Sequence, residues 1–174
     1  NGGPIIAVAV ENEYGSFADD AEYLKWTGDL MQELGVDVPM FTANGFEKYK
    51  MQYGTNKDYW TCLDLHKLTD EAIANIRELQ PDKPIFIAEL WGGRGQQQGG
   101  FFARQMPEDV AENYKSILEK GAFVNFYMFC GGTNFGFLNG ALKGRYNCGV
   151  SMPDTYIPFG TSYDVDAPVT EYGE

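Results

Sequence analysis

The sequence predicts an α/β fold in which a parallel sheet forms part of a (β/α)8 TIM barrel. Short apolar segments with strand character alternate with segments of helical periodicity, in the order β-α-β-β-α-β-α-β. This alternation is typical of a parallel sheet with right-handed crossovers. A complete barrel usually needs about 250 residues, whereas this chain has 174. We therefore expect residues 1–174 to form a portion of a barrel.

A doubly wound nucleotide-binding sheet is the main alternative, and the glycine pattern disfavours it. Gly93 and Gly95 are followed by glutamines, without a third glycine and without an immediate helix. The dinucleotide-binding fingerprint is therefore missing, and no P-loop sequence replaces it.

The predicted strands place polar residues at one edge of the sheet. The first strand, residues 5–10, is an unbroken apolar run that we expect to be buried on both faces. It runs into Asn12 and Glu13, at the strand end where barrels of this kind keep their catalytic residues. Further strands are expected at residues 38–42, at 59–63 before Asp64, at 85–88 before Glu89, and at 122–129.

The helices are predicted from apolar spacing and from their end signals. Gly35 and Gly121 stand where two helices should stop, and Pro107 stands where the last one should start. A short helix is possible near residues 46–53, and the segment 140–174 is expected to be mostly irregular. The expected apolar faces are Leu24, Met31 and Leu34; Ile73, Ile76 and Leu79, in a helix capped by Asp70; and Val110, Tyr114, Ile117 and Leu118.

Composition narrows the classes of partner. The net charge is −12 and the pI is about 4.4, which disfavours binding to nucleic acid or to an anionic membrane. The longest apolar run, residues 122–130, is too short to span a bilayer. The chain begins at Asn1, so no leader sequence can be read from it. The 11 Tyr, 12 Phe and 3 Trp suit a sugar-binding cleft as well as a core.

The cysteines favour neither a disulfide framework nor a metal centre. Cys62, Cys130 and Cys148 are odd in number and lack CxxC spacing. His66 is the only histidine, so a metal hydrolase is poorly supported. A Cys62–His66 hydrolase would lack an orienting third group. We expect no cofactor, and we expect Cys130 to be a packed, inert thiol.

Two strand ends carry the same kind of acid. Glu13 follows the first strand and Glu89 follows the fourth, so both should lie at one rim of the barrel. Most glycoside hydrolases use a pair of carboxyl groups, one as the general acid and the other as the nucleophile or base. The simpler reading, a rim salt bridge, fits a single acid better than a pair flanked by Asn12 and Trp91.

Four segments together are similar to the glycoside hydrolase family 35 β-galactosidases. They occur in the family's order and cover nearly the whole chain. They are residues 2–16, ending VENEYGS; 87–92 (IAELWG); 123–129 (FVNFYMF) with 131–136 (GGTNFG); and 161–168 (TSYDVDAP).

The resemblance implies a retaining mechanism and assigns roles. Glu13 would be the general acid/base, Glu89 the nucleophile, and Asn12 a donor to the sugar 2-hydroxyl. Retention predicts that the two carboxyl groups lie about 5–5.5 Å apart, with environments that push their pKa values apart. No cofactor is implied.

The same resemblance suggests further substrate contacts. Trp91 would form a stacking wall, Tyr127 would hydrogen-bond Glu89 or the sugar, and Tyr163 would lie at the sugar site; packing in a core or rim remains the alternative for Trp91 and Tyr127. Val165 stands where the family has a tyrosine, which leaves specificity for another sugar open.

The resemblance also implies what the chain lacks. Residues 1–174 would be the C-terminal portion of the catalytic barrel, about strands 4 to 8, without strands 1–3. The expected partners are a β-galactoside oligosaccharide or glycoconjugate, and an N-terminal half-barrel or a second copy of the chain. Localisation cannot be read from the sequence; the resemblance alone implies a secreted, periplasmic or lysosomal protein. Because half a barrel leaves open strand edges, a non-catalytic carbohydrate-binding or structural remnant is the alternative.

Overall fold

The computed structural model describes residues 3–93, 95–98, 104–134, 138–143, 146–147, 150–151, 156–163 and 166–174. It divides into two compact units. The first, here called the sheet unit, comprises Asn1–Leu90 and Asn113–Asn125. The second, the hairpin unit, comprises Trp91–Glu112 and Phe126–Glu174.

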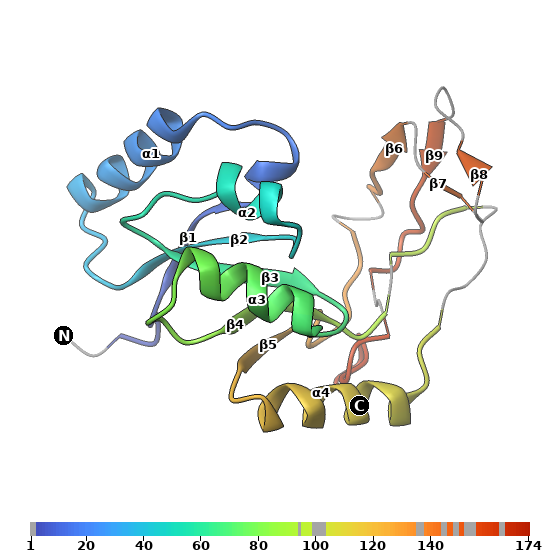
Figure 1. Ribbon diagram of the computed structural model, residues 1–174. Helices are drawn as coiled ribbons and strands as arrows, with labels where there is room; N and C mark the ends of the chain where they lie inside the picture. The colour runs from blue at the N-terminus through green and yellow to red at the C-terminus, as the bar shows by residue number, and fades with distance from the viewer. Residues whose placement is uncertain are drawn as a thin grey trace. The chain divides into compact units, whose positions relative to one another are not determined.

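The sheet unit is built on five strands in the order β1-β2-β3-β4-β5, with parallel pairing (Figure 1). Helices alternate with the strands, as the sequence predicts, so the fold class is α/β. The strands are β1 (Val8–Asn12), β2 (Met40–Asn44), β3 (Trp60–Leu65), β4 (Phe86–Trp91) and β5 (Phe123–Tyr127). The helices are the 3-10 turn η1 (Tyr14–Ser16), α1 (Ala21–Glu33), α2 (Lys48–Tyr53), α3 (Asp70–Leu79) and α4 (Pro107–Glu119).

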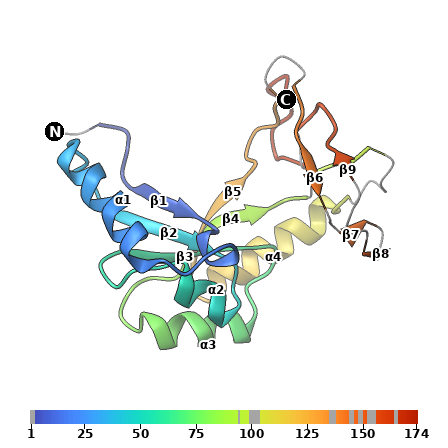
Figure 2. The same cartoon turned by 90° about the horizontal axis from the view of Figure 1, so that it is seen from above.

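The two faces of this sheet differ. Helices α1, α2 and α3 lie on one side of it (Figure 2), where Leu24 and Ile76 are fully buried. The opposite face, here called the inner face, carries the small buried side chains Ala43, Cys62 and Ala88. Larger, partly buried side chains pack against these three: Phe41, Trp60 and Phe86.

Register irregularities interrupt the sheet at two places. Leu63 pairs with Ile87 and Leu65 with Leu90, so β4 contains one extra residue between these levels. A β-bulge of this kind re-aims the side chains that follow it. A second shift separates Ala9 from Glu11 where β1 pairs with β2.

The hairpin unit contains short antiparallel pairs within the segment that was predicted to be mostly irregular. Strand β6 (Ala141–Lys143) pairs with β9 (Tyr156–Pro158), and β7 (Tyr146–Asn147) pairs with β8 (Val150–Ser151). Among the residues that the structure describes, no helix is long and apolar enough to cross a membrane.

Several predicted boundaries were wrong, for physical reasons. The first strand begins at Val8, and Ile5 and Ile6 are 65% and 82% exposed; apolarity alone does not bury a segment that has no neighbouring strand. Thr69, rather than Asp70, caps α3, because its hydroxyl accepts the Ala72 N–H at 3.1 Å. Glu89 lies within β4 rather than after it.

The helix end signals were more reliable. Gly35 and Gly121 have φ values of +98° and +72°, a left-handed conformation that favours glycine. Both α4, starting at Pro107, and the short helix α2 are confirmed. Leu34, assigned to the buried face of α1, is instead 78% exposed.

Candidate active site

Glu13 occupies a turn immediately after β1. Its φ and ψ are 53° and 23°, a left-handed conformation that is uncommon for a residue with a side chain. Its backbone N–H donates to the Ala43 carbonyl at 2.7 Å, and its carbonyl accepts from the Ser16 N–H at 2.9 Å. The first bond ties Glu13 to β2 and the second closes the turn, so both hold Glu13 where the chain leaves the sheet.

A buried asparagine fastens this turn to the sheet unit. Asn44, at the end of β2, is fully buried; its Oδ1 accepts the Gly15 N–H at 3.3 Å and its Nδ2 donates to the Gly54 carbonyl at 3.0 Å. A Cβ atom on Gly15 would lie 1.8 Å from the Lys50 carbonyl oxygen. Only glycine therefore fits between Glu13 and the C-terminal end of α2.

Asn12 precedes Glu13 and is placed by the bulge in β1. It pairs with Ala43, whereas Glu11 pairs with Thr42. Because paired residues of neighbouring strands share a sheet face, Asn12 lies on the inner face beside Ala43. Glu11 instead accepts the Tyr23 hydroxyl at 2.5 Å, which ties it to α1.

Glu89 reaches the inner face through the other bulge. Leu65 and Leu90 pair on the helix side, and Glu89 pairs with Asp64 one level earlier. Glu89 and Asp64 therefore lie side by side on the inner face, on adjacent strands. Glu89 is partly buried and has interactions with its surroundings.

Asp64 is a third acid in this neighbourhood. It is 1% exposed, and neither carboxyl oxygen has a hydrogen-bond partner within the part of the chain that the structure describes. Burial, the charge of Glu89 and the charge of Glu13, in decreasing order, raise the pKa of Asp64 to about 8. The nearby Glu89 backbone N–H opposes this rise.

No role was predicted for Asp64, although the residue was expected at the end of a strand. The same rule that singled out Glu13 and Glu89, an acid after a parallel strand, would have found it. Glu13, Asp64 and Glu89 thus form an acidic set within which Asp64 is the most buried. No three His, Cys, Asp or Glu side chains of the described residues are grouped so as to hold a metal ion.

The predicted tyrosines lie in the hairpin unit. The Tyr127 and Tyr163 hydroxyls are 3.4 Å apart, and their rings meet edge to face with centroids 6.4 Å apart. The Tyr163 N–H donates to the Gly132 carbonyl at 2.6 Å. Trp91, half-buried, begins the same unit. The proximity of Tyr127 to Glu89 stays a prediction, and Val165 lies outside the described residues, as do Phe135 and Gly136 of the GGTNFG segment.

The cysteines differ in their surroundings. Cys62 is fully buried, and burial raises its pKa, which is the environment of an unreactive thiol and disfavours a Cys62–His66 nucleophile. Cys130 is exposed, so the expectation of a packed thiol was wrong. It lies just beyond β5, at the bridge to Val169, where the chain runs along the surface.

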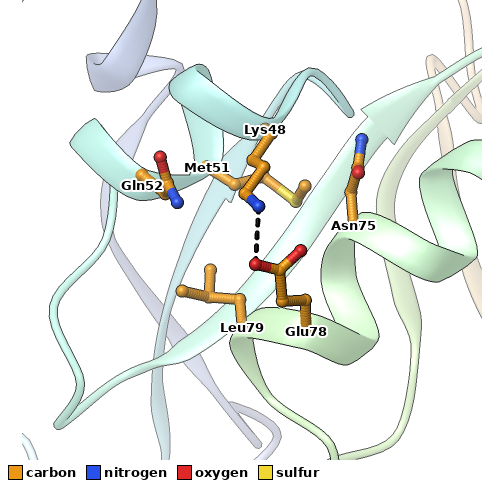
Figure 3. Close-up of a pocket in the computed structure, with 6 residues that line it drawn as sticks. All are labelled: Lys48, Met51, Gln52, Asn75, Glu78 and Leu79. Atoms are coloured by element: carbon orange, nitrogen blue, oxygen red, sulfur yellow. Dashed lines mark hydrogen bonds and ion pairs between the residues drawn. The ribbon is translucent and has the colours of Figure 1, made fainter.

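A small pocket lies on the helix side, between α2 and α3 (Figure 3). An ion pair between Lys48 and Glu78, at 2.5 Å, crosses it, and the remaining lining side chains are Met51, Gln52, Asn75 and Leu79. None of these is among the predicted site residues, so the acidic set on the inner face remains the better candidate.

Proteins with similar sequences indicate the family of this chain. Residues 1–174 match the family described as "Glycosyl hydrolases family 35". The beta-galactosidase of Homo sapiens is 38% identical over 179 residues, which cover 100% of this chain and 25% of that protein. The beta-galactosidase of Xanthomonas manihotis is 38% identical over 175 residues, covering 99% of this chain and 28% of that protein.

A third relative, the "Beta-galactosidase-1-like protein 3" of Mus musculus, is 34% identical over 174 residues, covering 100% of this chain and 25% of that protein. The chain spans about a quarter of the length of these relatives. Since the family match extends over the whole chain, this protein belongs to glycosyl hydrolases family 35.

Proposed function

We propose that this chain carries both catalytic carboxyl groups of a retaining exo-β-glycosidase, which releases terminal β-linked galactose. The observation that supports it best is the acidic set: Asp64 lies beside Glu89 and is influenced by the charges of both Glu89 and Glu13. Two acids around a common point are what cleavage of a glycosidic bond needs.

The proposed reaction is a double displacement. The Glu89 carboxylate attacks the anomeric carbon while Glu13 gives its proton to the departing glycosidic oxygen, which leaves a glycosyl ester on Glu89. Glu13, now ionised, then takes a proton from water as the water oxygen attacks the same carbon and releases Glu89. Galactose leaves with retained configuration, and both acids return to their starting states.

Four further residues would hold the sugar. Asn12, on the inner face directly before Glu13, would donate its amide to the 2-hydroxyl. Trp91 would stack against the ring, because indole faces suit the apolar side of a sugar. Tyr127 and Tyr163, which approach each other at their hydroxyl groups, would donate hydrogen bonds to the sugar or to Glu89.

The chain would supply strands 4 to 8 of the barrel, as the C-terminal portion of the catalytic domain. Strands 1–3 would come from an N-terminal half-barrel or from a second copy of the chain. The inner face supports this proposal, since Phe41, Trp60 and Phe86 remain only partly buried where the interior of a closed barrel is filled.

A non-catalytic carbohydrate-binding or structural role is the second candidate. The supporting observation is that β1 ends the sheet and Ile6 before it is 82% exposed. An open edge next to exposed apolar residues needs a cover, and without one the acidic set would not close around a sugar.

The deciding experiment measures hydrolysis of p-nitrophenyl β-D-galactoside by the 174-residue chain and by the same chain joined to the missing strands. The β-glucoside and β-xyloside run in parallel, since Val165 leaves specificity open. The proposed function requires galactoside turnover with retention, lost in Glu89→Gln. A folded, barrel-complete protein that cleaves none of the three substrates would instead support the non-catalytic role.

A further inference from the structure

Asp64 is a buried titratable group that the double displacement does not use. It lies on the inner face, in register with Glu89 on the adjacent strand. Adjacent strands are about 4.8 Å apart, so the two carboxyl groups extend from neighbouring points of the backbone. Asp64 is 1% exposed, whereas Glu13 and Glu89 are only partly buried.

The surroundings of Asp64 favour its uncharged form. Neither of its oxygens accepts a hydrogen bond from any described donor, and an ionised carboxylate buried without partners is strongly disfavoured. Three neighbouring carboxyl groups also cannot all carry a negative charge without strong repulsion. The most buried of the three is the one that should keep a proton.

We propose that Asp64 is a positioning residue, which stays protonated in the working protein and directs its O–H toward the Glu89 carboxylate. This proposal rests on the proposed function, because it gives Asp64 a purpose for the nucleophile. A neutral acid beside Glu89 stabilises the ionised nucleophile by hydrogen bonding and adds no third negative charge to the set.

The raised pKa of Asp64, about 8, is consistent with this assignment at neutral pH. Glu13 has a different task, since it must gain and lose a proton in each cycle. The three acids would therefore divide the work: Glu89 stays charged, Asp64 stays neutral, and Glu13 alternates.

Infrared spectroscopy tests the protonation state without requiring activity. The C=O stretch of a protonated carboxyl is recorded near pH 7, where ordinary carboxyl groups are ionised. The variants are Asp64→Asn and, as the matched control, Asp82→Asn at an exposed position of the same unit. We expect Asp64→Asn alone to lack a band that the parent protein shows. Identical spectra for the parent and Asp64→Asn would overturn the proposal.

Kinetics of the barrel-complete protein test the positioning role. Asp64→Asn keeps a neutral donor, so we expect kcat/KM to fall less than tenfold, with both limbs of its pH profile in place. Asp64→Leu lacks a donor, and we expect a roughly ten- to hundredfold fall. If Asp64 carried a charge, Asp64→Asn would move both limbs to lower pH, which would refute the proposal.

The infrared and kinetic experiments distinguish failure of the proposed function from failure of the Asp64 proposal. A parent protein without any glycosidase activity would refute the proposed function, while the infrared band would still report whether Asp64 holds a proton. Circular dichroism of Asp64→Leu confirms that the variant is folded before its rate is interpreted. Equal rates for folded Asp64→Leu and Asp64→Asn would overturn the donor role.

Discussion

Glu13 and Glu89 are positioned near Asp64 by different backbone features. Both follow a register shift in a parallel strand. Glu13 then leaves the sheet in a left-handed turn, whereas Glu89 stays inside β4 with paired residues on either side of it. The position of Glu13 depends on close packing around its turn. The position and charge of Glu89 depend on the strand pairing and on the protonation state of Asp64.

The two supports suit the two proposed catalytic roles. A nucleophile must stay in place while a bond forms to it, and a strand inside a sheet is the more rigid support. A residue that both gives and takes a proton must reach two oxygens in turn. The turn that carries Glu13 suits that task, although it is fixed at Asn44 and Gly15.

The largest expected effect comes from removing each acid in turn. Glu89→Gln should lower kcat/KM on p-nitrophenyl β-D-galactoside by roughly 10⁴-fold or more, since no covalent intermediate can form. Glu13→Gln should lower the same rate far less, because p-nitrophenolate departs without a proton. With an alkyl galactoside, Glu13→Gln should lose roughly 10²–10⁴-fold.

The leaving-group comparison is the control for those two variants. Steady-state rates on both substrates, measured at one pH, separate the roles. If kcat/KM of Glu13→Gln fell equally on both substrates, the assignment of Glu13 would be wrong. If instead Glu89→Gln kept more of its rate on the p-nitrophenyl substrate than on the alkyl galactoside, the two roles would be reversed.

The next largest effect is a pH dependence of folding stability, caused by Asp64 beside Glu89. The folded protein holds the Asp64 proton up to a pKa of about 8, whereas the unfolded chain releases it near pH 4. Between those values the folded state binds more protons, so its stability falls as pH rises. The slope from this group is at most about 1.4 kcal/mol per pH unit.

Urea unfolding of the parent protein and of Asp64→Asn at pH 5, 6, 7 and 8 measures this slope. The stability of Asp64→Asn relative to the parent should increase with pH over this range and level off above it. Parallel curves for the two proteins would mean that Asp64 titrates normally, and the contrast between a charged Glu89 and a neutral neighbour would be lost.

A smaller effect is expected on the Glu13 side. Gly15→Ala places a methyl group 1.8 Å from the Lys50 carbonyl oxygen, and overpacking of this kind typically destabilises by about 1–3 kcal/mol. Gly3→Ala is the control, since nothing lies within 4 Å of its Cβ position. The midpoint temperature of thermal unfolding and kcat should both fall for Gly15→Ala and not for Gly3→Ala. Unchanged values for Gly15→Ala would show that the turn tolerates displacement.

Periodicity was enough to predict the α/β order, because it reports which side chains can be buried along an element. It could not locate strand ends, since these depend on neighbours distant in sequence. Ile5 and Ile6 have the composition of a strand, but pairing begins at Val8, where Met40 lies opposite. Thr69 and Asp70 are both suitable caps, and only the position of the Ala72 N–H selects between them.

The candidate site was predictable in part for the same reason. Glu13 and Glu89 stood out because each follows an apolar strand, but neither bulge is visible in the sequence. A bulge leaves no recognisable mark in the hydrophobic pattern, although it decides which face of the sheet an acid occupies. The same strand-end rule applies to Asp64, but its burial beside Glu89 depends on strand pairing and is not visible in the sequence.

The smallest expected effect tests whether a tyrosine supports Glu89. Tyr127→Phe removes one hydroxyl of the Tyr127–Tyr163 pair. If that hydroxyl donates to Glu89 or to the sugar, kcat/KM should fall about tenfold, which is the value of one hydrogen bond to a charged group. The acidic limb of the pH profile should also move to higher pH, because Glu89 would lose a donor to its ionised form. Tyr156→Phe, at a side chain that is 76% exposed, is the control. A Tyr127→Phe protein with unchanged kcat and KM would contradict a hydrogen bond from Tyr127 to Glu89 or to the sugar.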